Sequence, residues 1–144
     1  MNTELFVNTL NSSEITCLYE FLFCFETKIK NLKNNTSITA LVDELNKYNT
    51  AHNIKLFGKR KSPVPNCDIT IHNELHFTNY ITNVLAFLTH LRNSIAHCQI
   101  TSIGDCFVIK DFYNKKITMN GYVEKCHLIE IINMVLKFTE VNLV

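Results

Sequence analysis

Apolar residues that recur at three-residue and four-residue steps limit most strongly how this chain can fold. The first such stripe consists of Ile15, Leu18, Leu22, Phe25, Ile29 and Leu32, which is the spacing of one helix face. Asn11 and Glu14 have the spacing of a capping box, so the helix is predicted to begin there. Aromatic residues outside the stripe, among them Tyr19 and Phe23, indicate a helix that is deeply buried or shared with a second subunit.

Three more segments have regular patterns. Helical spacing over residues 36–49, 74–98 and 123–142 predicts three further helices. Two runs of alternating apolar residues, 107–112 and 116–119, flank Tyr113, Asn114 and Lys115 and predict a β-hairpin. We therefore expect an all-α fold, a helical bundle with a small hairpin before its last helix.

Length and charge restrict the class of protein further. The chain has 144 residues, 47% of them hydrophobic, which suits a single domain over residues 1–144. The formal net charge is +1, so the molecule lacks the strong positive field of a general nucleic-acid binder, and any RNA contact must be local.

The expected environment is the cytoplasm. The first residues lack the basic stretch and apolar run of a secretory signal. The most apolar run, 15–25, is interrupted by Glu20 and is shorter than the roughly 20 apolar residues that cross a bilayer. Six cysteines without CxxC spacing are predicted to be free thiols. We expect a soluble cytoplasmic protein that does not contact a membrane.

A long connection over residues 53–73 contains Gly58, Pro63 and Pro65, which end regular structure. It also contains the basic run Lys59, Arg60 and Lys61. The pattern is typical of a solvated mobile loop. The more specific alternative is a basic segment that lies along a phosphate backbone, in which case these three residues would contact RNA.

The chemically most informative segment is Leu91-Arg92-Asn93-Ser94-Ile95-Ala96-His97-Cys98. Arginine holds a phosphate with a planar fork that keeps its charge, and histidine exchanges protons near neutral pH. Arg92 and His97 together therefore indicate chemistry on a phosphodiester.

A polar ridge accompanies this motif on the predicted third helix. Its members share one helical spacing and are nearly uncharged: Asn79, Asn83, Ala86, His90, Asn93 and His97. A solvated face more usually carries lysine and glutamate, so we expect the ridge to lie in a cleft or a wet subunit interface. His90 is accordingly a predicted RNA contact.

Residues 92–97, late on a helix and followed by a hairpin and a closing helix, resemble the RxxxxH signature of the HEPN superfamily. The resemblance implies an up-and-down bundle of four to five helices. It also implies a metal-independent endoribonuclease without cofactors, of the kind found in toxin-antitoxin and other defence systems. Arg92 would bind the phosphate, His97 would transfer protons and Asn93 would orient the pair. A ribose 2′-hydroxyl would attack the adjacent phosphate, so DNA would not be cut.

Helical geometry adds the expectation of a homodimer. At about 100° per residue, Arg92 and His97 lie roughly 140° apart around an ideal helix, whereas Asn93 and His97 share a face. Either the helix loosens near His97, or two copies of the motif complete one cleft. The active sites of HEPN ribonucleases lie at a dimer interface, so the resemblance implies a cleft with both copies of Arg92 and His97.

Other interpretations stay open. The chain could be a catalytically inert HEPN-like dimeric interaction module, with Arg92 paired to an acid such as Glu20 or Asp43. A metal site at His72 and His76 near Cys67 is the weaker rival, because a second cysteine pair and an HExxH core are missing. An antitoxin partner is left open. In some family toxins a tyrosine two residues after the histidine is modified by the antitoxin, and here that position is Gln99.

Overall fold

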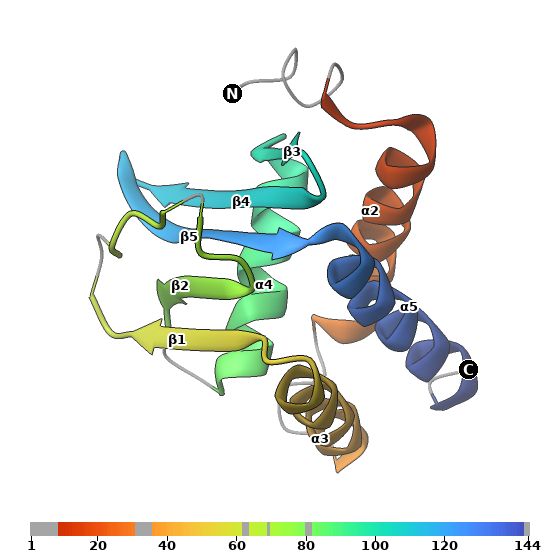
Figure 1. The fold of residues 1–144 in the computed structure, drawn as a ribbon. Coiled ribbons are helices and arrows are strands. Elements are labelled where there is room, and N and C mark those ends of the chain that lie inside the picture. Colours follow the sequence, from red (N-terminus) through yellow and green to blue (C-terminus); the bar gives the residue numbers. More distant parts are fainter. Residues whose placement is uncertain (1–8, 31–35, 62–63, 69, 80–81, 143–144) are drawn as a thin grey trace.

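The computed structural model describes residues 9–30, 36–61, 64–68, 70–79 and 82–142 (Figure 1). In this part of the chain, the helices are α2 (Ser12–Cys24), its π-helical continuation η1 (Phe25–Ile29), α3 (Thr36–Ala51), α4 (Asn83–Ala96) and α5 (Lys125–Asn142). The strands are β1 (Lys55–Lys59), β2 (Glu74–Thr78), β3 (Ile100–Ile103), β4 (Cys106–Tyr113) and β5 (Lys116–Glu124). The prediction of an all-α bundle is therefore wrong, because the chain has an α/β fold with a five-stranded sheet.

The sheet is mixed and has the order β1-β2-β5-β4-β3. Strands β1 and β2 are parallel, and the other neighbouring pairs are antiparallel. The predicted hairpin exists as β4 and β5, but it is longer than expected and forms the middle of the sheet. Its turn residues Asn114 and Lys115 have φ values of 50° and 65°, as a type I′ hairpin turn requires.

Three strands, β1, β2 and β3, were not predicted, and β3 lies between the predicted third helix and the predicted hairpin. β1 lies within the segment 53–73 that was predicted to be a loop, and β2 lies where the third helix was predicted to begin. Leu75 and Phe77 alternate along β2 and are both fully buried, which is the two-residue period of a strand. α4 begins only after Thr82, whose side chain accepts a hydrogen bond from the backbone N–H of Leu85.

The start of the first helix is as predicted. The Asn11 side chain accepts from the Glu14 backbone N–H at 2.8 Å, and the Glu14 carboxylate accepts from the Asn11 backbone N–H at 3.0 Å. This reciprocal pair is a capping box. The helix then widens into the π-helical segment η1, whose Glu26 contacts Arg92 on α4.

Helices pack on the sheet in two places. α4 crosses one face of the sheet and contacts β1, β2 and β4, whereas α2 and α5 lie side by side at the end where β5 leads into α5 (Figure 1). Both groups share one core, whose fully buried aromatic side chains are Phe21, Phe77, Phe87 and Phe107. All six cysteines are free, as predicted. Within the described residues, no helix combines the length and the apolar character of a membrane span.

Candidate functional site

His97 lies at the end of α4, outside the regular helix. It is the C-cap residue, with φ −97° and ψ 9°, and the following residue, Cys98, has φ 55°. The Gln99 N–H donates to the Ser94 carbonyl at 2.7 Å, and the Cys98 N–H donates to the Ile95 carbonyl at 3.1 Å. These bonds form a Schellman motif, which ends the helix and leaves the His97 side chain exposed. Because the His97 N–H still donates to the Asn93 carbonyl at 3.0 Å, the helix is kept up to His97 and departs from regular geometry only after it, so the helix end does not remove the predicted angle between Arg92 and His97.

Arg92 is held from two sides. Its Nε donates to Oε1 of Glu26 on η1, and its Nη1 donates to Oδ1 of Asn93 at 2.9 Å. Arg92 and Glu26 side chains are about one-third exposed, at 31% and 30%. The hydrogen bond from Arg92, and next the one from Lys30, lowers the pKa of the Glu26 carboxyl below its ordinary value. Arg92 is thus paired with an acid, but the acid is Glu26 and neither Glu20 nor Asp43.

Asn93 connects this pair to a buried acid on the sheet. Its Nδ2 donates to Oδ2 of Asp111 on β4 at 3.2 Å, and the same oxygen lies 2.8 Å from Nδ1 of His90. The other ring nitrogen of His90, Nε2, lies 2.8 Å from the carbonyl oxygen of Thr78 on β2. The His90 and Asp111 side chains are only 12% and 5% exposed. A continuous polar network thus joins η1, α4, β4 and β2.

The polar ridge faces the sheet of its own chain. Asn83 Nδ2 donates to the Leu56 carbonyl on β1 at 3.3 Å, while His90 and Asn93 bond to β2 and β4 as described above. These three residues therefore form a polar layer between α4 and the sheet. His90, which the sequence suggested as an RNA contact, has both ring nitrogens engaged within the chain. His97 lies apart from this layer, on the surface.

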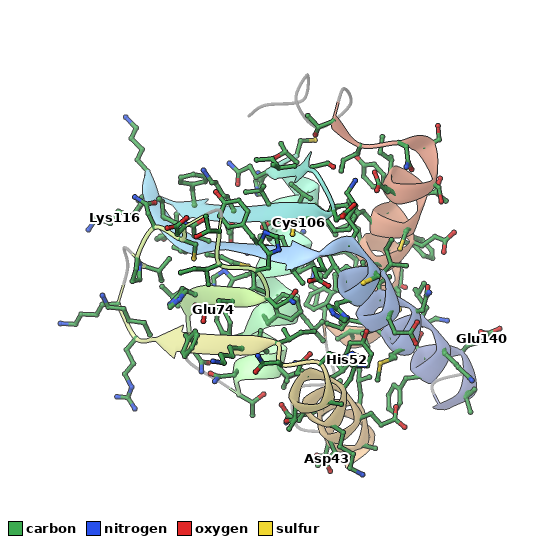
Figure 2. All side chains as sticks on the ribbon, in the orientation of Figure 1. Asp43, His52, Glu74, Cys106, Lys116 and Glu140 are labelled. Carbon is green, nitrogen blue, oxygen red and sulfur yellow. The ribbon has the colours of Figure 1, made fainter. Side chains whose placement is uncertain are left out.

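The predicted basic residues lie at the edge of the sheet where strands β1 and β2 end. Lys59 ends β1, and Arg60 and Lys61 follow; all three are exposed. Lys59 is in register with Thr78 at the end of β2, and Phe77 of β2 is in register with Met119 near the start of β5. The β4–β5 turn therefore reaches the same edge, where Figure 2 shows Lys116 pointing outward. Lys115 and Lys116 were not among the predicted contacts.

Two residues of the network were missed in the sequence. Asp111 had a usable signal, because it shares a strand face with the fully buried Phe107 and Ile109 and is thus an acid at an inward position. Glu26 had none, because it is 66 residues from Arg92 in the chain. Within the described residues, no hydrogen bond joins Arg92 to His97.

The weaker metal prediction gains no geometric support. The Cys67 thiol donates to the Asn120 carbonyl at 3.2 Å, and the His76 ring stacks on Phe57 at a centroid distance of 4.7 Å. Among the described residues, Cys67, His72 and His76 do not form a group of clustered ligand atoms.

Comparison with protein families shows which family the chain belongs to. The model of the HEPN pEK499 p136 family matches residues 2–143. The chain belongs to this HEPN family. The comparisons gave no significant match among curated proteins or among solved structures. Membership confirms the resemblance drawn from residues 92–97, and it supports a HEPN-type function of the nuclease or toxin class. In this HEPN chain, the motif arginine is anchored by Glu26 and Asn93, while the motif histidine is exposed at the helix end.

Proposed function

We propose that the chain is a metal-independent endoribonuclease of the HEPN type that acts as a toxin or defence effector. The observation that carries this proposal is the contrast between the two motif residues. His97 is exposed just beyond the last turn of α4, and Arg92 is held in a defined orientation by Glu26 and Asn93. An accessible proton carrier and a preorganised cation on the same helix are the two groups that cleavage of an RNA phosphodiester requires.

In the proposed reaction, a ribose 2′-oxygen attacks the adjacent phosphorus and the bond to the 5′-oxygen breaks. His97 transfers the protons that this exchange requires, and the products are a 2′,3′-cyclic phosphate and a 5′-hydroxyl. Arg92 stabilises the phosphate charge. A guanidinium has five N–H donors. The contacts to Glu26 and Asn93 use one donor on Nε and one on Nη1, which leaves Nη2 for a phosphate.

We further propose that the active form is a homodimer. Tyr19 and Phe23 are 44% and 70% exposed, and they lie on the same side of the helix that carries Glu26. Partial burial, and then the neighbouring Cys98 thiol, raises the pKa of the Tyr19 hydroxyl, so this side also adjoins the end of α4. Exposed aromatic side chains beside a polar site are typical of an interface. A second copy on this face would bring two copies of Arg92 and His97 together.

RNA is proposed to approach along the basic edge of the sheet. Lys59, Arg60 and Lys61 lie there with Lys115 and Lys116, and Tyr113, which is 71% exposed, offers a ring for base stacking. A local concentration of lysine and arginine provides phosphate contacts although the net charge is only +1. His90 is proposed to position Asn93 through their shared bond to Asp111, instead of contacting RNA itself.

The test is cleavage of an end-labelled RNA in excess chelator by the purified full chain. We expect products with cyclic phosphate ends, no cutting of DNA of the same sequence, and loss of cleavage in Arg92→Ala. Arg60→Ala is the matched control, because Arg60 lies on the edge of the sheet, and it should weaken binding without abolishing cleavage. Cleavage that requires added metal, or that Arg92→Ala leaves unchanged, would contradict the proposal.

A second candidate function, an inert interaction module, is favoured by one observation. The Arg92 guanidinium is already engaged by Glu26, so it could serve only to hold η1 against α4. In that case the purified chain would not cut RNA in any buffer, and its expression would not arrest growth. For a toxin, we expect growth arrest that His97→Ala relieves, and any antitoxin partner would suppress the same arrest.

A further inference from the structure

A second cluster of reactive side chains lies where β5 meets α5. Glu124 ends β5, and Cys126 and His127 belong to the first turn of α5. One ligand atom from each, the carboxylate oxygen, the thiol sulfur and an imidazole nitrogen, lies within 4.8 Å of the other two. The intervening Lys125 points away, with its Nζ 2.9 Å from Glu14. The three side chains therefore share one location without a competing cation between them.

The spacing of these atoms approaches that of a metal site. With zinc-to-ligand distances of about 2.0 to 2.3 Å, the ligand atoms of a tetrahedral site lie about 3.3 to 3.6 Å apart. Here His127 Nε2 lies 3.2 Å from Glu124 Oε2, and Cys126 Sγ lies 3.9 Å from the same oxygen. Only small side-chain movements separate this arrangement from coordination.

His127 also has the second hydrogen-bond partner that orients most metal-binding histidines. Its other ring nitrogen, Nδ1, lies 3.0 Å from the Tyr48 hydroxyl on α3. A hydrogen bond at Nδ1 fixes the ring so that Nε2 faces the carboxylate and the thiol. The His52 ring stands 4.9 Å from the His127 ring, where α3 approaches the start of α5 (Figure 2). The His127 side chain is only 15% exposed, so the histidine side of the site is shielded from solvent.

The choice of metal follows from the ligands. A thiolate, an imidazole and one carboxylate form a donor set that suits Zn²⁺ and does not suit Mg²⁺ or Ca²⁺, which prefer oxygen ligands. Cys106, a buried thiol on β4 in register with Glu124, does not belong to the group of clustered ligand atoms. Cys126 is exposed, so the fourth position is open to water.

We propose that Glu124, Cys126 and His127 bind Zn²⁺, with water in the fourth position and Tyr48 as the partner that orients His127. The bound ion would stabilise the β5–α5 junction next to α3, because its ligand His127 also contacts Tyr48 of α3. The site shares no residue with the proposed cleavage site at Arg92 and His97, which requires no metal. Metal binding and RNA cleavage can therefore be tested independently.

The experiment titrates the metal-free full chain with Zn²⁺ and, separately, with Co²⁺. We expect one Zn²⁺ per chain, a rise in Tm with zinc, and the charge-transfer absorption of a cobalt-thiolate bond. Cys126→Ser should abolish this absorption, and His127→Ala should weaken zinc binding by about 100-fold or more. Tyr48→Phe should weaken it by about 10-fold, because the orienting bond is lost.

The matched control is Cys67→Ser combined with His76→Ala, which removes a cysteine and a histidine outside the cluster. It should bind zinc as the wild type does. Circular dichroism of the metal-free variants separates lost binding from lost folding, and the exposed Cys126 should tolerate serine. Absence of stoichiometric zinc binding by the folded wild type, or binding that Cys126→Ser and His127→Ala leave intact, would overturn the proposal.

Discussion

Asp111 and His90 form a pair across the interface between β4 and α4, with Oδ2 and Nδ1 2.8 Å apart and side chains that are only 5% and 12% exposed. The same carboxylate oxygen accepts a hydrogen bond from Asn93, whose own oxygen accepts from Arg92. The buried Asp111 carboxylate therefore orients both the His90 ring and the Asn93 amide, which lie on successive turns of α4. The orientation of the partly exposed Arg92 side chain depends, through Asn93, on the buried Asp111 of the sheet.

Removing this carboxylate should destabilise the fold strongly. Asp111→Ala leaves His90 and Asn93 without their shared acceptor inside the protein, and each buried donor left without a partner costs about 1 to 3 kcal/mol. Equilibrium urea unfolding measures the loss. The control is Asp105→Ala, since Asp105 is exposed and its substitution should change the free energy of unfolding by less than about 0.5 kcal/mol. A similar small effect for Asp111→Ala would show that the network contributes little.

The ion pair between Glu26 and Arg92 predicts a pH dependence. Hydrogen bonds from Arg92 and Lys30 lower the Glu26 pKa in the folded state. The stabilisation is therefore complete above the unfolded-state pKa and disappears as the pH falls through the lowered folded-state value. An NMR titration of the Glu26 side chain should give a midpoint below that of an ordinary glutamate, and Arg92→Ala should raise it. A midpoint that Arg92→Ala does not move would argue against the pair.

The hairpin turn predicts a stabilising substitution. Lys115 has a φ of 65°, a conformation that costs a residue with a side chain about 1 kcal/mol and that glycine adopts freely. Lys115→Gly creates the Asn-Gly sequence preferred in type I′ turns and should raise the free energy of unfolding by about 0.5 to 1 kcal/mol. Lys116→Gly, one position later within β5, should lower it. Thermal unfolding of both variants checks this, and destabilisation by Lys115→Gly would contradict the turn geometry.

The exposed face of α2 predicts the assembly. Phe23 is 70% exposed, so Phe23→Glu should leave the fold intact but place a charge in the proposed dimer interface. Light scattering on a gel-filtration column should show a dimer for the wild type and a monomer for the variant. The variant should also cleave RNA more slowly than the wild type. Phe112→Glu is the control, because Phe112 is 41% exposed on the hairpin, away from α2. A wild-type monomer that cuts RNA would rule out the composite cleft.

The helices and the hairpin could be predicted because their patterns are local. The capping box at Asn11, the stripe that leads into α2, and the alternation in β4 and β5 each lie within one element. The sheet could not be predicted, because β1 is five residues long, contains Gly58 and is surrounded by turn residues. β2 continues directly toward α4, so its Leu75 and Phe77 were counted with the helix.

The candidate site was predictable only in part for the same reason. Arg92, Asn93 and His97 form a local motif, and their family is now established. Their partners Glu26 and Asp111 are 66 and 18 residues distant, and such contacts depend on how α4 packs between η1 and the sheet. The polar ridge was expected at an interface because the sheet that covers it had not been predicted.

The initial rate of RNA cleavage by His97→Ala tests the proposed chemistry most directly. The exposed position of His97 means that alanine should preserve the fold, so a change in rate reports on proton transfer. In excess chelator, the rate should fall by about 100-fold to 10,000-fold relative to the wild type. His72→Ala, which removes another exposed histidine, should keep the wild-type rate. Cleavage by folded His97→Ala at the wild-type rate would contradict the assignment of His97 as the catalytic residue.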